Sequence, residues 1–353
     1  MVETLNIAVQ ETAKSRLSTV DFSNIIFGKN YADHMFSADY KDGEWHDLKI
    51  IPYGEISFEP SLASLHYGQA IFEGMKAYKD FTDGGINIFR PTENAARFNA
   101  SAVRMCMPEI PEEIFVNALA QLVALDRNWV PDTWGSSLYI RPFMFATDEF
   151  VGVRPSQTYK FMVFCSPAGQ YYTEAIKVKV ETHYTRAAEG GTGFAKCAGN
   201  YGGALYPSLL AQKEGYHQLL WTDAAEHQYF EESGTMNAMF VINDVLLTPA
   251  TSDSILKGIT RKSVVALVKS WGMQVEERKV SIIEIMTAIE NGSLKEVFGV
   301  GTAATIAPIA VIGYEGKDYV LPESRTVGNR ILQELNDIKH GKQADTHGWN
   351  FKV

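Results

Sequence analysis

One lysine, Lys196, lies among small residues downstream of the glycine-rich run 189–193. Small neighbours leave room for a bulky group beside the amine, and a lysine removed from water loses proton affinity. Such a lysine can act as a nucleophile or form a Schiff base with a carbonyl compound. The phenol of Tyr201 and the carboxylate of Glu232 follow within one stretch of chain. A solvated surface lysine is the simpler alternative for any lysine taken alone, so other segments have to decide.

Three short segments have the features of anion-binding sites. Gly258-Ile259-Thr260 lies where a loop enters a helix, so backbone N–H groups and the helix dipole point to one place. Gly301-Thr302-Ala303 ends a strand and offers small residues and one hydroxyl. Arg90 precedes a helix that starts with proline, where a guanidinium can bind a phosphate through two hydrogen bonds. With a lysine, a phenol and a carboxylate, this set indicates pyridoxal phosphate.

Other chemistries are excluded by spacing. Lys196 is followed by cysteine and not by the serine or threonine of a phosphate-binding P-loop. Gly299-Val300-Gly301 lacks the third glycine of a dinucleotide-binding motif. No cysteine or histidine pair has the spacing of a metal site, so no metal is expected. His340 and His347 flank a polar tail and are expected at the surface.

Length and composition narrow the class of protein. A chain of 353 residues is long for one core, and two domains are the default. A net charge of −10 disfavours nucleic-acid binding, and no apolar run approaches the roughly 20 residues of a membrane span. Residues 1–17 are expected to be a loose lead-in without the apolar core of a signal peptide. Three widely spaced cysteines predict free thiols in the cytoplasm.

The predicted fold class is α/β (α+β), because strands and helices mix without the regular order of a doubly wound sheet. Pro167 and Gly169 interrupt the pattern near its middle. The predicted domains are therefore a small N-terminal domain over 1–167, a linker over 168–176 and a larger C-terminal domain over 177–353. Helices are expected over 91–104, 204–214, 261–271 and 327–339, a hairpin turn at Asp42-Gly43, and a capping box at Ser281-x-x-Glu284.

The motifs in chain order resemble the fold-type IV pyridoxal-phosphate enzymes. The residues that carry this resemblance are Lys196-x-x-Gly199-Asn200-Tyr201, Glu232-x-Gly234-Thr235-x-Asn237, Gly258-Ile259-Thr260-Arg261 and Gly301-Thr302-Ala303. Within that group, the branched-chain amino-acid aminotransferases are resembled by Leu65-His66-Tyr67-Gly68, Phe72-Glu73-Gly74-Met75-Lys76 and Tyr139-Ile140-Arg141-Pro142. The resemblance covers about 27–322 and implies a C-terminal domain that is barrel-like and binds the cofactor.

The resemblance also implies roles around the cofactor. Lys196 is expected to carry pyridoxal phosphate as a Schiff base and, once released, to move the substrate proton. Glu232 is expected to face the pyridine nitrogen, and Tyr201 the ring oxygen. The other residues implied around the cofactor are Arg90, Arg186, Leu256, Gly258, Ile259, Thr260 and Thr302.

The implied activity is reversible amino transfer between L-Leu, L-Ile or L-Val and 2-oxoglutarate. Glutamate shares the pocket, so a polar group must meet its second carboxylate. Arg141 is the candidate, and a structural arginine that bridges strands is the alternative. One methylene changes binding by only about 1–3 kcal/mol, so all three branched acids are expected to be used. The other implied substrate residues are Tyr67, Phe72, Tyr139, Thr235, Ala303 and Ala304, with Tyr31 a weaker candidate and Val153 from the partner subunit of a homodimer.

One departure from the family pattern removes a possible regulation. Some members carry a redox-active Cys-x-x-Cys after the Gly-Thr-Ala turn, but Ala304 and Ala307 occupy those positions here. Two alternatives share the fold, a D-amino-acid aminotransferase and an aminodeoxychorismate-type lyase. A third alternative, from another class, is a non-catalytic small-molecule-binding protein in which Lys196 is a surface residue.

Overall fold

The computed structural model describes residues 5–169 and 174–353. The chain forms two compact units, and each is described by itself. Unit 1 comprises 1–171, 195–199 and 336–353, and unit 2 comprises 172–194 and 200–335.

Two parts of the predicted C-terminal domain therefore group with unit 1. The first is the segment 195–199, in which Cys197 forms an isolated β-bridge with Ile71. The second is the C-terminal segment, in which β19 (Asn350–Lys352) pairs with β6 (Ile86–Phe89). Both pairings join residues that are far apart in the sequence, so local sequence patterns do not predict them.

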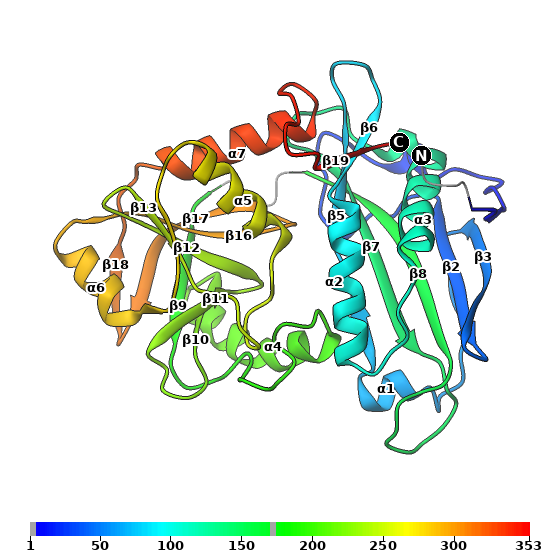
Figure 1. Ribbon diagram of the computed structural model, residues 1–353, viewed down its shortest axis with the longest axis horizontal. Coiled ribbons are helices and arrows are strands. Elements are labelled where there is room, and N and C mark those ends of the chain that lie inside the picture. The colour runs from blue at the N-terminus through cyan, green and yellow to red at the C-terminus, as the bar shows by residue number, and fades with distance from the viewer. Residues whose placement is uncertain (1–4, 170–173) are drawn as a thin grey trace. The chain divides into compact units, whose positions relative to one another are not determined.

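Unit 1 is built on a sheet whose described strands follow the order β1-β3-β2-β8-β7-β5-β6-β19, with β4 paired to β7 (Figure 1). Apart from the parallel β1–β3 pair, neighbouring strands are antiparallel. The remaining strands are β1 (Ala8–Val9), β2 (His34–Lys41), β3 (Glu44–Pro52), β4 (Ala70–Phe72), β5 (Met75–Lys79), β7 (Ser137–Ala146) and β8 (Tyr159–Ala168). The helices are α1 (Ala63–Tyr67), α2 (Pro91–Arg104) and α3 (Glu112–Leu125), with 3₁₀ turns η1 (Leu17–Thr19) and η2 (Arg127–Trp129).

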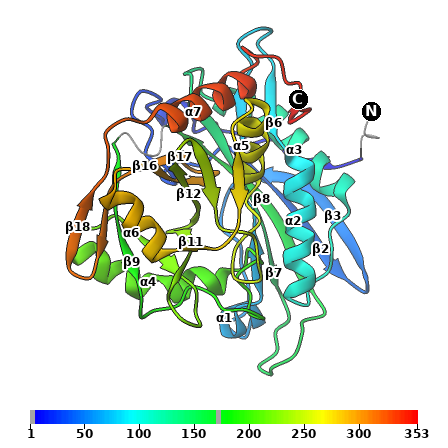
Figure 2. The ribbon, with the colours of Figure 1, turned by 60° about the vertical axis from the view of Figure 1, so that its left-hand side comes forward.

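Helices α2 and α3 lie side by side and pack on this sheet (Figure 2). Their apolar stripes meet it through aromatic rings. Phe98 of α2 and Phe115 of α3 both contact Phe161 of β8, with ring centroids 5.4 and 5.7 Å away. Such ring pairs stabilise a core beyond their simple burial. These contacts fix α2, which carries the Ser101 hydroxyl that binds the backbone of Lys196.

Unit 2 contains a closed ring of strands. The described strands run β14-β13-β12-β16-β17-β9-β10-β11-β15, and an additional β11–β12 pairing closes β12, β16, β17, β9, β10 and β11 on themselves. Closure pairs the edges that an open sheet would expose, and the predicted barrel-like α/β fold is confirmed. The strands of this unit are β9 (Ile176–Glu181), β10 (Gln218–Thr222), β11 (Tyr229–Ser233), β12 (Met236–Ile242), β13 (Val245–Thr248), β14 (Val275–Glu277), β15 (Val280–Ser281), β16 (Leu294–Gly301), β17 (Thr305–Tyr314) and β18 (Lys317–Val320).

The later helices are α4 (Ala198–Lys213), α5 (Ile259–Ser270), α6 (Ile282–Glu290) and α7 (Thr326–Lys339). The capping box is confirmed, because the Ser281 hydroxyl accepts the Glu284 N–H. Helix α4 begins at Ala198, earlier than predicted. Its first turn is held by Asn200, whose side-chain amide donates to the Thr192 carbonyl at 2.8 Å and accepts the Thr192 hydroxyl at 2.7 Å. This tertiary contact outweighs the low helix propensity of the glycines.

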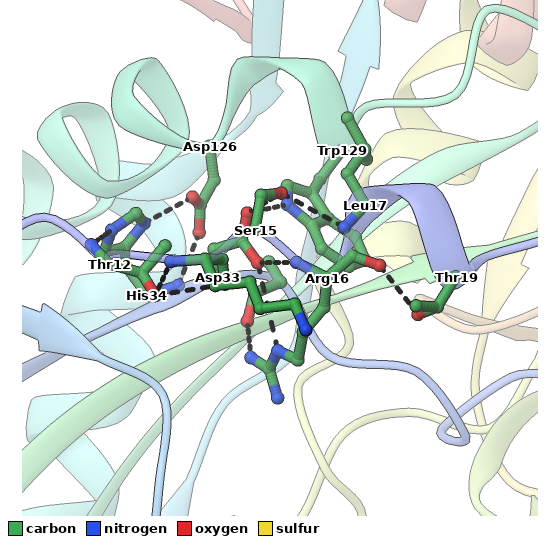
Figure 3. A network of polar contacts seen from close by, with 11 residues as sticks. Thr12, Ser15, Arg16, Leu17, Thr19, Asp33, His34, Asp126 and Trp129 are labelled. Carbon is green, nitrogen blue, oxygen red and sulfur yellow. Dashed lines mark hydrogen bonds and ion pairs between the residues drawn. The ribbon is translucent and has the colours of Figure 1, made fainter.

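The expected loose lead-in is wrong for the described residues. Ala8 and Val9 form β1 and pair with β3, and polar contacts hold the chain from Thr12 onward (Figure 3). The Thr12 N–H donates to His34 Nε2 at 2.9 Å, and His34 Nδ1 lies 2.7 Å from Asp126. The Arg16 N–H donates to Asp33 at 2.8 Å. Because Nε2 accepts a hydrogen bond, the His34 proton is on Nδ1 and points to Asp126. Long-range polar contacts thus anchor a segment whose own sequence is weakly patterned.

His340 is buried and not at the surface as predicted, with 0% of the residue exposed. Its Nδ1 donates to the Lys79 carbonyl at 2.8 Å, Nε2 accepts the Gly135 N–H at 3.1 Å, and Phe81 stacks on the ring at 4.6 Å. Two backbone partners therefore satisfy a neutral imidazole, and burial lowers the pKa of His340. His347 is exposed, as expected.

Lys339, beside His340, yields a stability prediction. Burial, and then the neighbouring Lys76 ammonium, lower the pKa of Lys339 to about 7. The unfolded chain, with a lysine pKa near 10.4, binds this proton more tightly, so folding stability falls as the pH drops from about 10 towards 7. Lys339→Met should raise the free energy of unfolding at pH 7 by at least about 1 kcal/mol. Urea unfolding at pH 7 and pH 10 checks this, and an unchanged or lower stability at pH 7 would contradict it.

No helix among the described residues is long and apolar enough to cross a membrane.

Candidate active site

Lys196 stands just before α4, in unit 1, and its backbone is held on both sides. Its N–H donates to the Ser101 hydroxyl of α2 at 2.9 Å, and its carbonyl accepts the Phe72 N–H of β4 at 3.0 Å. The Lys196 ammonium lies 4.9 Å from the centroid of the Phe72 ring, within cation–π range. The amine is therefore placed by a strand and a helix that lie about a hundred residues earlier in the chain.

Phe72 also contacts the predicted substrate arginine. Arg141 has its guanidinium carbon 4.6 Å from the Phe72 centroid and 5.2 Å from that of Tyr139, and it donates to the Tyr139 hydroxyl at 2.7 Å. Within the described part of the chain, Arg141 Nε is buried without a hydrogen-bond partner. The predicted residues Lys196, Phe72, Tyr139 and Arg141 thus lie together.

A buried ion pair holds this cluster in place. Glu73 is 0% exposed and accepts hydrogen bonds from Arg97 of α2 at 2.7 and 2.8 Å. The same carboxylate accepts the Gly74 N–H at 3.1 Å. A Cβ at Gly74 would lie 2.2 Å from the Tyr139 hydroxyl, so only glycine permits this position of the tyrosine ring.

Three further predicted residues of unit 1 lie on other segments. Tyr67 ends α1 and is 38% exposed, and Val153 is 89% exposed in an apolar loop. Arg90 precedes α2 with a left-handed φ of 53°, pairs with Glu93 at 2.9 Å and lies over the Trp349 ring. Arg90 is thus held at the N-terminus of a helix, which favours anions.

Glu232 is the central buried carboxylate of unit 2, with 4% exposure. Its Oε1 accepts the Leu256 N–H at 2.7 Å, and its Oε2 lies 3.4 Å from Arg186 Nε. Arg186 also donates to the Ser254 carbonyl. The Glu232 side chain is therefore fixed by two of the residues predicted with it.

The predicted phosphate cradle adjoins this carboxylate. Gly258 is the N-cap of α5 and no side chain caps it, so the first N–H groups of the helix are available to a ligand. Asn237 donates to the Leu256 carbonyl at 2.9 Å, and a Cβ at Gly258 would lie 2.0 Å from Asn237 Oδ1. Close backbone approach therefore requires glycine here. Ile259 and Thr260 form the first turn of α5.

Thr235 and the 302–304 turn lie at the same end of the strand ring. Thr235 lies in the turn between β11 and β12, and Asn237 of β12 pairs with Val300 of β16. The turn 302–304, with Thr302, Ala303 and Ala304, directly follows β16. Tyr201 is half-buried in the first turn of α4.

Sequence reasoning missed residues that support the cluster. Ser101, Arg97 and Phe27 carried no functional signal, yet Ser101 holds Lys196, and the Phe27 ring meets Tyr139 edge-on at 5.1 Å. Asn237 was visible as part of a motif but without a role. Among the described residues, no group of three or more His, Cys, Asp or Glu is placed to hold a metal ion.

Comparison with known proteins identifies the family. The model of the amino-transferase class IV family matches residues 70–312. A probable branched-chain-amino-acid aminotransferase of Staphylococcus epidermidis is 46% identical over 352 residues, which cover 97% of each chain. The chain belongs to the class IV aminotransferases, among the branched-chain-amino-acid aminotransferases. Branched-chain-amino-acid aminotransferase 2 of Bacillus subtilis is 43% identical and matches 99% of this chain and 97% of its own.

Solved structures share the fold of this class IV aminotransferase. The branched-chain amino acid aminotransferase from Escherichia coli is 26% identical, with a TM-score of 0.73 over 90% of this chain and 98% of that chain. A second branched-chain amino acid aminotransferase, solved with pyridoxamine 5'-phosphate, is 26% identical, with a TM-score of 0.74 over 89% of this chain and 97% of that chain. The predicted fold class and the predicted aminotransferase class are confirmed.

Class IV aminotransferases use pyridoxal phosphate, and the donor set of this chain fits that group. The buried carboxylate Glu232 suits a protonated ring nitrogen. The start of α5 has no side-chain cap, and Gly258 permits a close approach of the backbone there, which suits a phosphate. Lys196 offers the amine.

Proposed function

We propose that this aminotransferase exchanges the amino group of L-Leu, L-Ile or L-Val with 2-oxoglutarate, using pyridoxal phosphate held by Lys196. The observation that carries the proposal is the Phe72 ring, which meets the Lys196 ammonium at 4.9 Å and the Arg141 guanidinium at 4.6 Å. The apolar Phe72 ring beside the Lys196 amine suits a branched side chain. The Arg141 guanidinium, which contacts the same ring, suits the second carboxylate of glutamate. The names of the relatives support the same substrates.

When bound, pyridoxal phosphate supplies a carbonyl for the amino group and an electron sink for the α-carbon. The Lys196 amine would take and return the proton of the substrate α-carbon, from a backbone fixed by Ser101 and Phe72. Glu232 would hold the proton of the ring nitrogen, because Arg186 and the Leu256 N–H fix its orientation.

The remaining predicted residues would bind and orient the cofactor and the substrate. The phosphate would be held by Arg90, by the Ile259 and Thr260 N–H groups and by the Thr302 hydroxyl. Tyr201 would donate to the ring oxygen, and the 302–304 turn would face the substrate α-carboxylate. The substrate pocket would comprise Phe72, Tyr139, Tyr67 and Thr235.

A homodimer is part of this proposal. Val153 is 89% exposed, and Phe150 and Val151 beside it are 47% and 69% exposed. An apolar loop of this kind favours contact with another chain, and Val153 would enter the pocket of the partner subunit. A cytoplasmic location is consistent with the three free cysteines, two of which are buried.

The test is an amino-donor panel with 2-oxoglutarate as acceptor, comparing L-Leu, L-Ile, L-Val, D-Ala and L-Phe. Turnover with all three branched acids within about tenfold of one another is expected. A preference for D-Ala would support a D-amino-acid aminotransferase, and a lack of amino transfer from all five donors would favour the lyase alternative. Absence of a cofactor absorbance band after pyridoxal phosphate is added would remove the cofactor from the proposal.

Arg141→Gln separates the two substrate classes. Removing a charge-assisted contact to the second carboxylate should raise KM for 2-oxoglutarate and L-glutamate about 10- to 100-fold. The KM for L-Leu should change less than about threefold, since a branched side chain gains nothing from the cation. Steady-state kinetics with both donors measure the ratio, and equal losses for leucine and glutamate would make Arg141 a structural arginine.

A further inference from the structure

Strand β11 carries a second buried carboxylate next to Glu232. Glu231 is 7% exposed. Its Oε1 accepts a hydrogen bond from the Ser254 hydroxyl, while its Oε2 is buried and makes no hydrogen bond within the described ranges 5–169 and 174–353. A buried, half-satisfied carboxylate costs folding stability, and none of the roles given above uses it.

Ser254 links Glu231 to the arginine that holds Glu232. Its hydroxyl meets Glu231, and its carbonyl accepts from Arg186. Arg186 Nε in turn lies 3.4 Å from Glu232. A Cβ at Gly193 would lie 2.6 Å from the Ser254 backbone, so the segment is closely packed and has little room to shift. Ser254 therefore contacts both Glu231 and Arg186, the arginine that is paired with Glu232.

Three charged groups act on Glu231, and each comes from a different segment. The Arg186 guanidinium favours its ionised form, whereas the charges of Glu232 and Asp223 oppose it. Burial is the largest influence and raises the pKa of Glu231. This carboxyl therefore gains a proton at a higher pH than a solvated glutamate does.

We propose that Glu231 is a positioning residue whose charge sets how strongly Arg186 holds Glu232, and through Glu232 the proton on the ring nitrogen. The inference rests on the proposed function, because it uses the role of Glu232. With Glu231 neutral, the Arg186 charge acts on Glu232 alone and lowers its proton affinity. With Glu231 ionised, the cation is shared, and Glu232 is a stronger acceptor for the ring N–H. A nearby charge shifts the pKa of a neighbouring group by about one unit, which is a tenfold change in its proton affinity.

The test compares Glu231→Gln, which removes the charge, with Glu231→Asp, which keeps it. In the wild type, kcat should fall at acidic pH as Glu231 gains a proton. Glu231→Gln should lower kcat about tenfold at pH 7.5 and remove that acidic limb, and Glu231→Asp should restore both. The absorbance spectrum of the bound cofactor should titrate about one pH unit lower in Glu231→Gln than in the wild type. An unchanged spectrum and an unchanged pH profile would overturn the inference.

The apo-protein gives a readout that needs no cofactor. Because the pKa of Glu231 is raised in the folded protein, its ionised form destabilises the folded state at pH values above the unfolded glutamate pKa near 4.3. Below that pH the carboxyl is protonated in both states, and this loss of folding stability disappears. Apo Glu231→Gln should therefore melt higher than the wild type at pH 7 but not at pH 4. A purely structural carboxylate predicts the reverse, a lower melting temperature at pH 7, and that result would also overturn the inference.

Glu232→Gln separates this inference from the proposed function. If Glu232→Gln alters the cofactor spectrum and Glu231→Gln does not, only the role of Glu231 is wrong. If neither variant alters the spectrum, the placement of Glu232 at the ring nitrogen is wrong as well.

Discussion

Lys196→Ala is expected to lower kcat by about 10⁴-fold or more, because one amine both holds the cofactor and moves the substrate proton. The loss should lie in kcat and not in cofactor binding, since the predicted phosphate ligands and Glu232 remain. Stopped-flow absorbance with L-Leu measures the first half-reaction directly. A small added amine such as methylamine should restore part of the rate by replacing the missing base.

Two variants make this result specific. Lys213→Ala removes an exposed lysine from the end of α4 and should leave turnover within about twofold, as surface substitutions usually do. Lys196→Arg keeps a positive charge but cannot release its proton near neutral pH, so it should be as inactive as the alanine variant. Turnover above a tenth of the wild-type rate in Lys196→Ala would remove this lysine from the mechanism.

Local signals in the sequence predicted local structure. The hairpin at Asp42-Gly43 forms with φ values of 54° and 86° at its two turn residues, as a two-residue turn requires. The helix expected over 91–104 is α2 with those bounds, and the Ser281 cap has its expected bond. These features depend on neighbouring residues, so the information needed to predict them lies within a few positions.

Contacts between distant residues were not predictable in the same way. His340 sits in a polar tail, yet Lys79, Gly135 and Phe81 enclose it from far along the chain. Thr12 is held by His34 in a segment without periodicity. No composition rule distinguishes a polar residue with buried partners from a solvated one, because the partners are known only after folding.

The candidate site also contains residues that the sequence predicts and residues that it does not. The motifs and their order indicated Lys196, Glu232 and Gly258, because the expected chemistry requires an amine, a carboxylate and a close backbone approach at these positions. The residues that place them, such as Ser101 for Lys196 and Asn237 for Gly258, act across long sequence separations. Their side chains are common in helices and strands, so type alone gives no signal.

Arg97→Met is expected to destabilise the protein by about 3–5 kcal/mol, because it leaves the fully buried Glu73 carboxylate without its cation. Activity should fall as well. Glu73 also fixes the Gly74 N–H, and Phe72 beside it donates to the Lys196 carbonyl. A shift of Glu73 would therefore reach the amine and the Phe72 ring together. Urea unfolding of the apo-protein gives the loss of stability, and kcat for L-Leu gives the functional part.

A double variant separates charge from packing. In Glu73→Gln with Arg97→Met both charges of this pair are gone, so most of the stability should return, to within about 1–2 kcal/mol of the wild type. Glu73→Gln alone should cost less than Arg97→Met alone, since a guanidinium that is partly accessible can be solvated. If the double variant were as unstable as Arg97→Met, the lost stability would come from packing around α2. The Glu73–Arg97 pair would then carry no net coupling, and the position of Phe72 would depend on the helix itself.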